Sequence, residues 1–174
     1  MNEVKQFLLH LKDYEIFACD EVGLQLDTLT IRAWLKKGEK TVVEVERGRE
    51  RTNFIGMLSQ KSRKCHLYQI EIGNQKEILK ALENLVEEYP DKRICIVWDN
   101  AKAHKGKELR EALGGTLKCG HLINLPPYAP DTNPIEHVWK KAKDQMSGKL
   151  EKGLEEVKNE FHSFITSSIF NYKI

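Results

Sequence analysis

The sequence predicts an α/β domain built on a mixed β-sheet. Short alternating segments rich in Thr, Val, Ile, Phe and Tyr fill residues 14 to 72, and such segments are typical of antiparallel strands. From about residue 75 the apolar residues recur at helical spacing instead. Beyond that helix, strand and helix patterns alternate, which is the order expected of an α/β fold.

The first half of the chain predicts one helix and several strands. A short amphipathic helix is expected over residues 2–12, because Val4, Phe7, Leu8 and Leu11 have helical spacing. A strand over 14–20 follows. Alternation then predicts strands over 25–30, 41–46, 52–59 and 65–72, with a turn over 34–38.

The second half predicts helices that alternate with two strands. An apolar stripe from Ile78 to Val86 indicates a helix over 75–88, which Tyr89-Pro90-Asp91 ends. The nearly unbroken apolar run over 93–98 is typical of a central strand that is covered on both faces. A helix over 105–113, a strand over 121–125 and helices over 134–146 and 150–167 follow.

Size and composition limit the possible classes of protein. A chain of 174 residues predicts one domain with a single core. No apolar run approaches the roughly 18 residues of a membrane span, and the N-terminus has no signal-peptide pattern, so we expect a cytoplasmic protein with no membrane partner. No GxGxxG follows the first strand and no GxxxxGK[ST] occurs, which excludes two nucleotide-binding folds.

The cysteines predict neither disulfides nor zinc. Cys19, Cys65, Cys95 and Cys119 have no CxxC spacing, and two of them lie in apolar strand-like runs. A thiol in such a run packs as a small apolar group, so we expect buried free thiols. Cys119-Gly120-His121 and Cys65-His66 each offer two possible zinc ligands, but not at the spacing of a structural site.

Charge is distributed unevenly along the chain, although the net charge is only +2. Residues 31–64 contain ten Lys or Arg against four Glu, a local balance of +6, whereas residues 71–91 contain two Lys against six acids, a balance of −4. One face turned toward a polyanion would explain this pattern, as would a set of solvated hairpins. The candidates for phosphate contacts are Lys36, Lys37, Lys40, Arg47, Arg49 and Arg51. Such contacts supply affinity rather than sequence choice.

Three acidic residues lie where they could hold metal ions. Asp20 closes the apolar run over 16–19, Asp99 closes the run over 94–98, and Glu136 lies one turn into a predicted helix. A carboxylate that follows a buried strand stands at the rim of the sheet, where substrate can reach it. Mg²⁺ takes oxygen ligands and usually combines one or two carboxylates with substrate phosphate, so this set suits phosphodiester chemistry.

The most specific segment of the sequence runs from Leu125 to Trp139. Four of the five prolines fall within nine of its positions and stiffen the connection between a strand and a helix. Asn133 is a good N-cap and Pro134 suits the first helical position, so Glu136 could instead complete a capping box with Asn133.

The two aspartates also have local interpretations. Asp20 and Asp99 could each simply end a strand, and Asp99-Asn100 could form a turn. These alternatives stay open for each residue taken alone. The order of the three acids along the chain matches one known constellation.

Three segments together resemble the DDE superfamily endonucleases, the catalytic domains of mariner-like insertion-sequence transposases. They are Ala18-Cys19-Asp20-Glu21, Trp98 to His104, and Leu125 to Trp139 with its Asn-Pro-Ile-Glu core, and the resemblance covers about residues 14–146. It implies a ribonuclease H-like fold, with a mixed five-stranded sheet and helices on both faces, over residues 14–174. Residues 1–13 would then form a linker helix.

The resemblance also implies the chemistry. Asp20, Asp99 and Glu136 would bind two Mg²⁺ or Mn²⁺ ions and catalyse DNA cleavage and strand transfer during transposition. Asn100 and His104, beside the second acid, are candidates to orient the ligands or contact phosphate. Alternatively, Asn100 bonds backbone in the turn and His104 caps or precedes the next helix.

Other polar residues near these segments are weaker candidates. We expect His137 to be an exposed first-turn residue rather than a ligand. Glu21 and Asp131 could substitute as ligands, but neighbouring residues on a strand point to opposite faces, which argues against Asp20 and Glu21 acting together.

The resemblance suggests partners and leaves alternatives. Mariner-like transposases have helix-turn-helix modules ahead of the catalytic domain, whereas this chain starts only about 13 residues before its first catalytic strand. We therefore expect a separate DNA-recognition module, transposon-end and target DNA as partners, and a homodimer. The alternatives are a non-catalytic nucleic-acid-binding or assembly protein derived from a transposase, and a nuclease acting on RNA in hybrids, which the proline-rich segment argues against.

Overall fold

The computed structural model of the chain describes residues 13–25, 37–38, 50–99, 101, 106–115, 117, 120–125, 132–147 and 153–174. The helix predicted over 2–12 and the strands predicted over 25–30 and 41–46 lie outside the described residues, apart from residue 25. The division into a linker over 1–13 and a domain over 14–174 stays a prediction.

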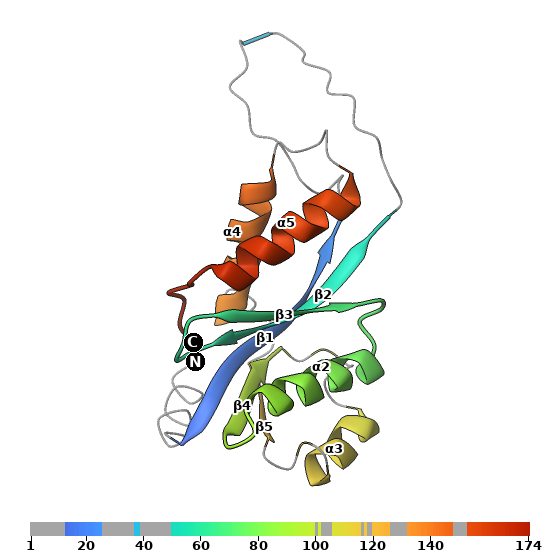
Figure 1. Ribbon diagram of the computed structural model, residues 1–174, viewed down its shortest axis with the longest axis vertical. Helices are drawn as coiled ribbons and strands as arrows, with labels where there is room; N and C mark the ends of the chain where they lie inside the picture. The colour runs from blue at the N-terminus through green and yellow to red at the C-terminus, as the bar shows by residue number, and fades with distance from the viewer. Residues whose placement is uncertain are drawn as a thin grey trace.

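Five strands form one mixed sheet, in the order β3-β2-β1-β4-β5 (Figure 1). The strands are β1 (Tyr14–Leu24), β2 (Thr52–Ser59), β3 (Cys65–Ile70), β4 (Arg93–Trp98) and β5 (Gly120–Asn124). β1, β2 and β3 pair antiparallel, whereas β4 and β5 run parallel to β1. The predicted mixed sheet is confirmed, and β2 and β4 have the predicted bounds.

β1 is longer than the sequence predicts. β2 pairs with it as far as Leu24↔Thr52, whereas β4 pairs with it only as far as Ala18↔Val97. The prediction that Asp20 closes this strand is therefore wrong: Asp20 lies inside β1, two residues beyond the last β1–β4 pair. The physical reason is that a distant antiparallel partner satisfies the backbone of the extra residues, and the local sequence gives no sign of that partner.

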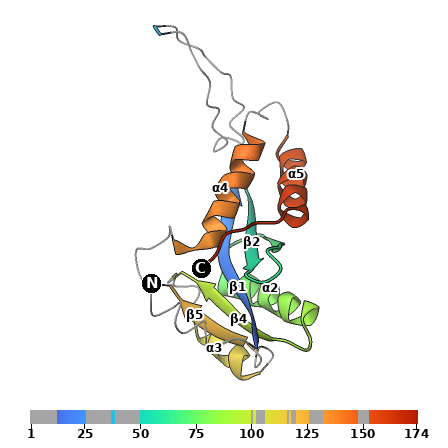
Figure 2. The same ribbon diagram turned by 90° about the vertical axis from the view of Figure 1, so that its left-hand side faces the viewer.

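In the described part of the chain, four helices cover the two faces of the sheet (Figures 1 and 2). They are α2 (Gln75–Glu88), α3 (Lys107–Gly114), α4 (Pro134–Met146) and α5 (Leu154–Ser167). α2 and α4 have the predicted bounds, α3 starts two residues later than predicted, and α5 begins at Leu154 after Gly153. α4 and α5 pack on one face and α2 on the other, which confirms helices on both faces.

Each face of the sheet has its own apolar core, and the alternation along β1 decides which residues enter which core. Ala18 and Val22 pack with α4 and α5, on what we call the α4 face. Phe17 and Cys19 pack with α2, on what we call the α2 face. Because strand residues alternate, Asp20 belongs to the α4 face and Glu21 to the α2 face. This supports the prediction that Asp20 and Glu21 do not act together.

Three of the predicted free thiols are confirmed. Cys19, Cys65 and Cys95 are buried and free, and Cys119 lies outside the described residues. Within the described ranges, no helix is both long enough and apolar enough to cross a membrane. The cytoplasmic location stays a prediction.

Candidate active site

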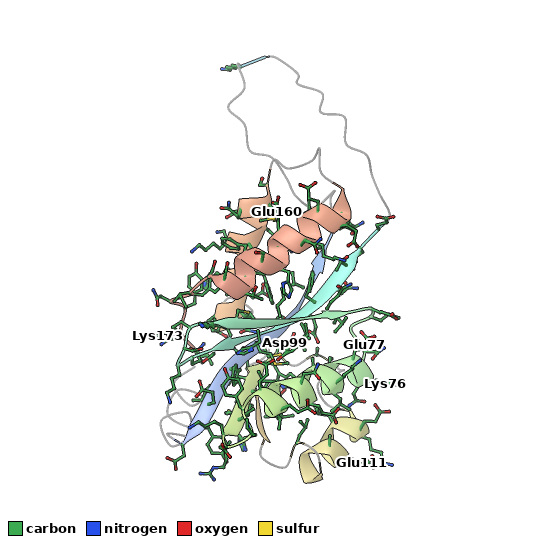
Figure 3. All side chains as sticks on the ribbon, viewed as in Figure 1. Lys76, Glu77, Asp99, Glu111, Glu160 and Lys173 are labelled. Atoms are coloured by element: carbon green, nitrogen blue, oxygen red, sulfur yellow. The ribbon has the colours of Figure 1, made fainter. Side chains whose placement is uncertain are left out.

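The parallel pairing of β1 and β4 brings the first two acids to the same edge of that pairing. The last β1–β4 pair is Ala18↔Val97, and Asp20 and Asp99 each lie two residues beyond it. Paired parallel strands lie about 4.8 Å apart, so the two acids start from neighbouring backbones. Asp99, labelled in Figure 3, lies near the middle of the molecule in that view. The topology therefore brings together two acids that are far apart in the sequence.

Asp99 follows β4 directly and is exposed. Its Oδ1 accepts a hydrogen bond from the Ala101 amide at 2.9 Å, which fixes the orientation of the carboxylate. Burial raises the pKa of the Cys19 thiol well above its usual value, and the charges of Glu21, Asp20 and Asp99 raise it further. Asp20 and Asp99 thus act electrostatically on the same point of β1.

Asn133 fastens the start of α4 to β1. Its Nδ2 donates a hydrogen bond to the Cys19 carbonyl at 3.0 Å, and the residue is only 3% exposed. Its side chain makes no capping hydrogen bond, so the alternative in which Asn133 and Glu136 form a reciprocal capping box loses the Asn133 half of that box. The side-chain amide of Asn133 bonds to β1 instead. It holds the first turn of α4 against Cys19, the residue that precedes Asp20.

Glu136 lies on that first turn and is exposed. Burial and, to a smaller extent, the charge of Glu136 raise the pKa of Asp20 to about 7, although a hydrogen bond from Trp139 lowers it. A carboxylate influences another in this way only at short range, because solvent screens distant charges. The third acid therefore lies within electrostatic reach of the first.

Trp139 is not among the residues that the sequence predicts for the site. Its indole Nε1 donates a hydrogen bond to Asp20 Oδ2 at 3.0 Å. The signal that could indicate this residue is its spacing: residues three apart on a helix lie on the same face, so Trp139 shares a face with Glu136. The spacing alone does not distinguish such a residue from a core tryptophan.

Four of the six predicted DNA-contacting residues lie outside the described residues. They are Lys36, Lys40, Arg47 and Arg49. Lys37 is exposed in a turn. Arg51 is exposed and its guanidinium lies over Gly23 of β1, since a Cβ at Gly23 would meet Arg51 Nε at 2.5 Å. The proposed role of this group in binding DNA stays a prediction.

Of the remaining candidate site residues, some lie outside the described residues and one is described. Asn100, His104 and Asp131 lie outside the described residues. His137 is exposed, and its ring lies 5.1 Å from that of Tyr172 between centroids. The prediction that His137 is an exposed residue is confirmed.

The donor chemistry of the site fits a hard divalent cation. Asp20, Asp99 and Glu136 offer only oxygen atoms, which Mg²⁺ and Mn²⁺ accept. Asp20 and Glu136 also repel each other, as the raised pKa of Asp20 indicates, and a bound cation would remove that repulsion. In the part of the chain that the structure describes, however, no three His, Cys, Asp or Glu side chains already form a ligand group.

Comparison with known proteins identifies the family and the fold. The model of the DDE superfamily endonuclease family matches residues 15–158. A search of the curated proteins gave no match. Among solved structures, the chain is similar to the Mos1 transposase paired-end complex with left transposon end, with a TM-score of 0.72, 15% identity, and coverage of 98% of this chain and 53% of that chain.

Two further solved structures are similar. The Mos1 mariner paired end complex with Mn gives a TM-score of 0.68 at 18% identity, covering 96% of this chain and 53% of that chain. The catalytic domain of Mos1 mariner transposase gives a TM-score of 0.66 at 14% identity, and the match covers 98% of this chain and 78% of that chain. The chain spans about half the length of the transposase chains in the two complexes. It has the ribonuclease H-like fold, and it belongs to the DDE superfamily endonucleases.

Proposed function

We propose that this domain is the catalytic part of a transposase that cleaves DNA phosphodiester bonds and transfers the cut strand. Asp20, Asp99 and Glu136 would bind two Mg²⁺ or Mn²⁺ ions. The observation that supports this most directly is the convergence of three distant segments at the place where β1 leaves β4. Family membership supports the endonuclease chemistry.

Each acid has a distinct support in the fold. Asp20 projects from a continuous strand. Asp99 follows a buried strand and is oriented by the Ala101 amide, and Glu136 projects from a helix that Asn133 ties to β1. Ligands on such rigid elements are held in place before substrate arrives. Asp20 must lose its proton before it can bind a cation, because only the carboxylate is a ligand.

Bound divalent ions would polarise the phosphate, lower the pKa of the attacking hydroxyl and stabilise the leaving oxygen. The chain itself supplies the ligand oxygens and aligns them with the reacting phosphate. Water as nucleophile gives cleavage, and a 3′-hydroxyl gives strand transfer. The same three residues would therefore serve both reactions.

DNA is the proposed substrate, and a separate recognition module and a second copy of the chain are the proposed partners. The similarity to complexes of Mos1 transposase with paired transposon ends supports DNA and the pairing of two ends. The length of those chains, about twice the matched part, supports additional DNA-recognition segments in a working assembly.

A non-catalytic nucleic-acid-binding protein is the second candidate. The observation that favours it is the lack, among the described side chains, of three acids already gathered as a ligand group. A protein of this kind would keep the fold and would bind DNA through phosphate contacts without cleaving it.

Plasmid nicking distinguishes the two candidates. Purified wild type, Asp99→Ala and Asp91→Ala are incubated with supercoiled plasmid and Mn²⁺. Asp91 is a matched control, since it is an exposed acid that precedes β4, whereas Asp99 follows it. We expect nicking by wild type and Asp91→Ala but not by Asp99→Ala.

Two results would favour the second candidate. Equal nicking by all three proteins would indicate a contaminant and remove the support for catalysis at Asp99. Absence of nicking by any protein, together with plasmid binding that weakens steeply with salt in all three, would point to a binding protein.

A further inference from the structure

Trp139 is joined to the first acid of the proposed site by a specific hydrogen bond. Its indole N–H donates to Asp20 Oδ2 at 3.0 Å. The residue is 3% exposed, and its ring stacks on Phe161 with centroids 6.5 Å apart. An indole N–H can only donate, and a bond to a carboxylate is stronger than one between neutral groups. Trp139 therefore restricts the orientation of the Asp20 carboxylate.

The sheet is shaped to accept this indole beside Asp20. The cross-strand neighbour of Asp20 on β2 is Gly56. A Cβ built on Gly56 would overlap Trp139 Cη2 and would lie 2.8 Å from Trp139 Cζ2 and 3.1 Å from Ile135 Cδ1. Any side chain at position 56 would thus displace the indole or force neighbouring atoms to move.

A backbone requirement does not explain Gly56. It is not among the glycines with positive φ, so its conformation is open to other residues. Glycine weakens the interior of a strand and often marks a position where another group approaches closely. The group that approaches Gly56 is the indole of Trp139, so the glycine and the tryptophan form one unit opposite Asp20.

Helix α4 brings two different groups to the same carboxylate. Glu136 and Trp139 are three residues apart and lie on one face of the helix. The charge of Glu136 acts on Asp20, and the N–H of Trp139 bonds to it. The packing of α4 against β1 therefore sets both how near Glu136 lies to Asp20 and how the Asp20 carboxylate is oriented.

We propose that Trp139, seated on Gly56, is a positioning residue that holds the Asp20 carboxylate in the orientation needed to bind the cation. This inference rests on the proposed function, because it concerns the same metal site. Groups that orient a metal ligand commonly change metal affinity or activity by about 10- to 100-fold when they are removed. A tryptophan that only fills the core would change stability and leave metal affinity unaltered.

Mn²⁺ binding by the full chain without DNA tests the proposal, measured by electron paramagnetic resonance of the free ion. Trp139→Phe keeps an aromatic ring but removes the N–H, and we expect about 10- to 100-fold weaker Mn²⁺ binding. In plasmid nicking, the Mn²⁺ concentration for half-maximal rate should rise while the rate at saturating Mn²⁺ changes much less.

Phe161→Leu is the matched control for packing. It removes the ring that stacks on Trp139 but leaves the indole N–H and Asp20 in place. We expect a lower melting temperature with unchanged Mn²⁺ affinity. Trp139→Phe with wild-type Mn²⁺ affinity, whatever its melting temperature, would overturn the proposal.

Gly56→Ala reaches the same hydrogen bond from β2 and keeps the proposal testable if Trp139→Phe does not fold. We expect it to weaken Mn²⁺ binding by a similar factor. The double variant, Gly56→Ala with Trp139→Phe, should bind Mn²⁺ no more weakly than whichever single variant binds it less tightly. Both changes remove the same hydrogen bond between Trp139 and Asp20. Additive losses would contradict a shared mechanism.

Asp20→Asn separates this proposal from the proposed function. If wild type binds Mn²⁺, Asp20→Asn does not, and Trp139→Phe binds as wild type does, only the positioning role fails. If wild type binds no Mn²⁺, or Asp20→Asn binds it equally well, both the metal site and the positioning role are wrong.

Discussion

Helices α2 and α4 begin with the same four-residue signature and use it in opposite ways. α2 follows Asn74 and has Glu77 three residues later, and α4 follows Asn133 and has Glu136 three residues later. Both segments match the Asn-x-x-Glu variant of a capping box. Only the first of them caps its helix.

At α2 the polar groups are used locally. Asn74 Oδ1 accepts from the Glu77 amide at 3.0 Å. Glu77 Oε2 accepts from the amides of Glu71 and Ile72 at 2.7 and 3.1 Å. Figure 3 labels Glu77 beside the first turn of α2, away from Asp99. A carboxylate that is engaged by two amides in this way stabilises a helix start.

At α4 the same residue types connect distant parts of the fold. Asn133 bonds to the Cys19 carbonyl rather than to its own helix, and Glu136 acts on Asp20. The difference teaches that a helix start near the rim of the sheet can give up its side-chain cap for a contact with a strand. The carboxylate is then left exposed and available for chemistry.

Neutralising each glutamate gives the largest expected contrast. We expect Glu136→Gln to reduce the rate of Mn²⁺-dependent nicking by more than about 100-fold, since a ligand matters more than the groups that support it. Glu77→Gln should keep wild-type activity and lose about 1 kcal/mol of stability, because a neutral side-chain oxygen accepts less strongly than a carboxylate from the two backbone amides. Initial rates and urea unfolding measure the two effects. Equal nicking rates for the two variants would break the comparison.

The pH dependence of metal binding should also distinguish the two glutamates. Because the pKa of Asp20 is raised to about 7, protons compete with the cation below that pH. The apparent Mn²⁺ affinity should fall by up to about tenfold per pH unit below about 7 and level off above it. Glu136→Gln should shift the break to lower pH by removing a repelling charge, whereas Glu77→Gln should not move it. Titrations across the pH range give the break directly.

The two asparagines should differ more modestly. Asn74→Ala removes a side-chain cap, which costs about 1 kcal/mol. Asn133→Ala leaves the Cys19 carbonyl without its partner in a buried place, which costs about 1–3 kcal/mol, and it loosens α4 from β1. Urea unfolding compares the stabilities. We also expect weaker Mn²⁺ binding for Asn133→Ala alone, and unchanged binding in that variant would argue that its tether does not support the site.

The smallest expected effect is on stability in the absence of metal. The folded state raises the pKa of Asp20 from 3.8 to about 7, so it binds more protons than the unfolded state between these values. The free energy of unfolding should therefore fall as pH rises from about 4 to about 7. The effect is the smallest of those expected here, because it comes from one carboxyl group and is spread over about three pH units. Asp20→Asn should remove this part of the slope in urea unfolding with a chelator, and an unchanged slope would contradict the assignment.

The sequence by itself determined the elements whose signals are local. β2, β4, α2 and α4 have the predicted bounds, because apolar periodicity and breaking residues act over a few positions. The mixed sheet follows from the order of these elements. The three acids could also be proposed as a site from the sequence, since two end or follow apolar runs and the third lies in a specific proline-rich motif.

Tertiary structure decided how those residues are used. Pairing with β2 extends β1 past Asp20, Asn133 bonds to a carbonyl 114 positions away, and Trp139 bonds to Asp20 across 119 positions. A local pattern shows which groups need hydrogen-bond partners, but not which partner is present once the chain has folded. The choice between a helix cap and a metal site at α4 therefore depends on where the sheet places Cys19 and Asp20.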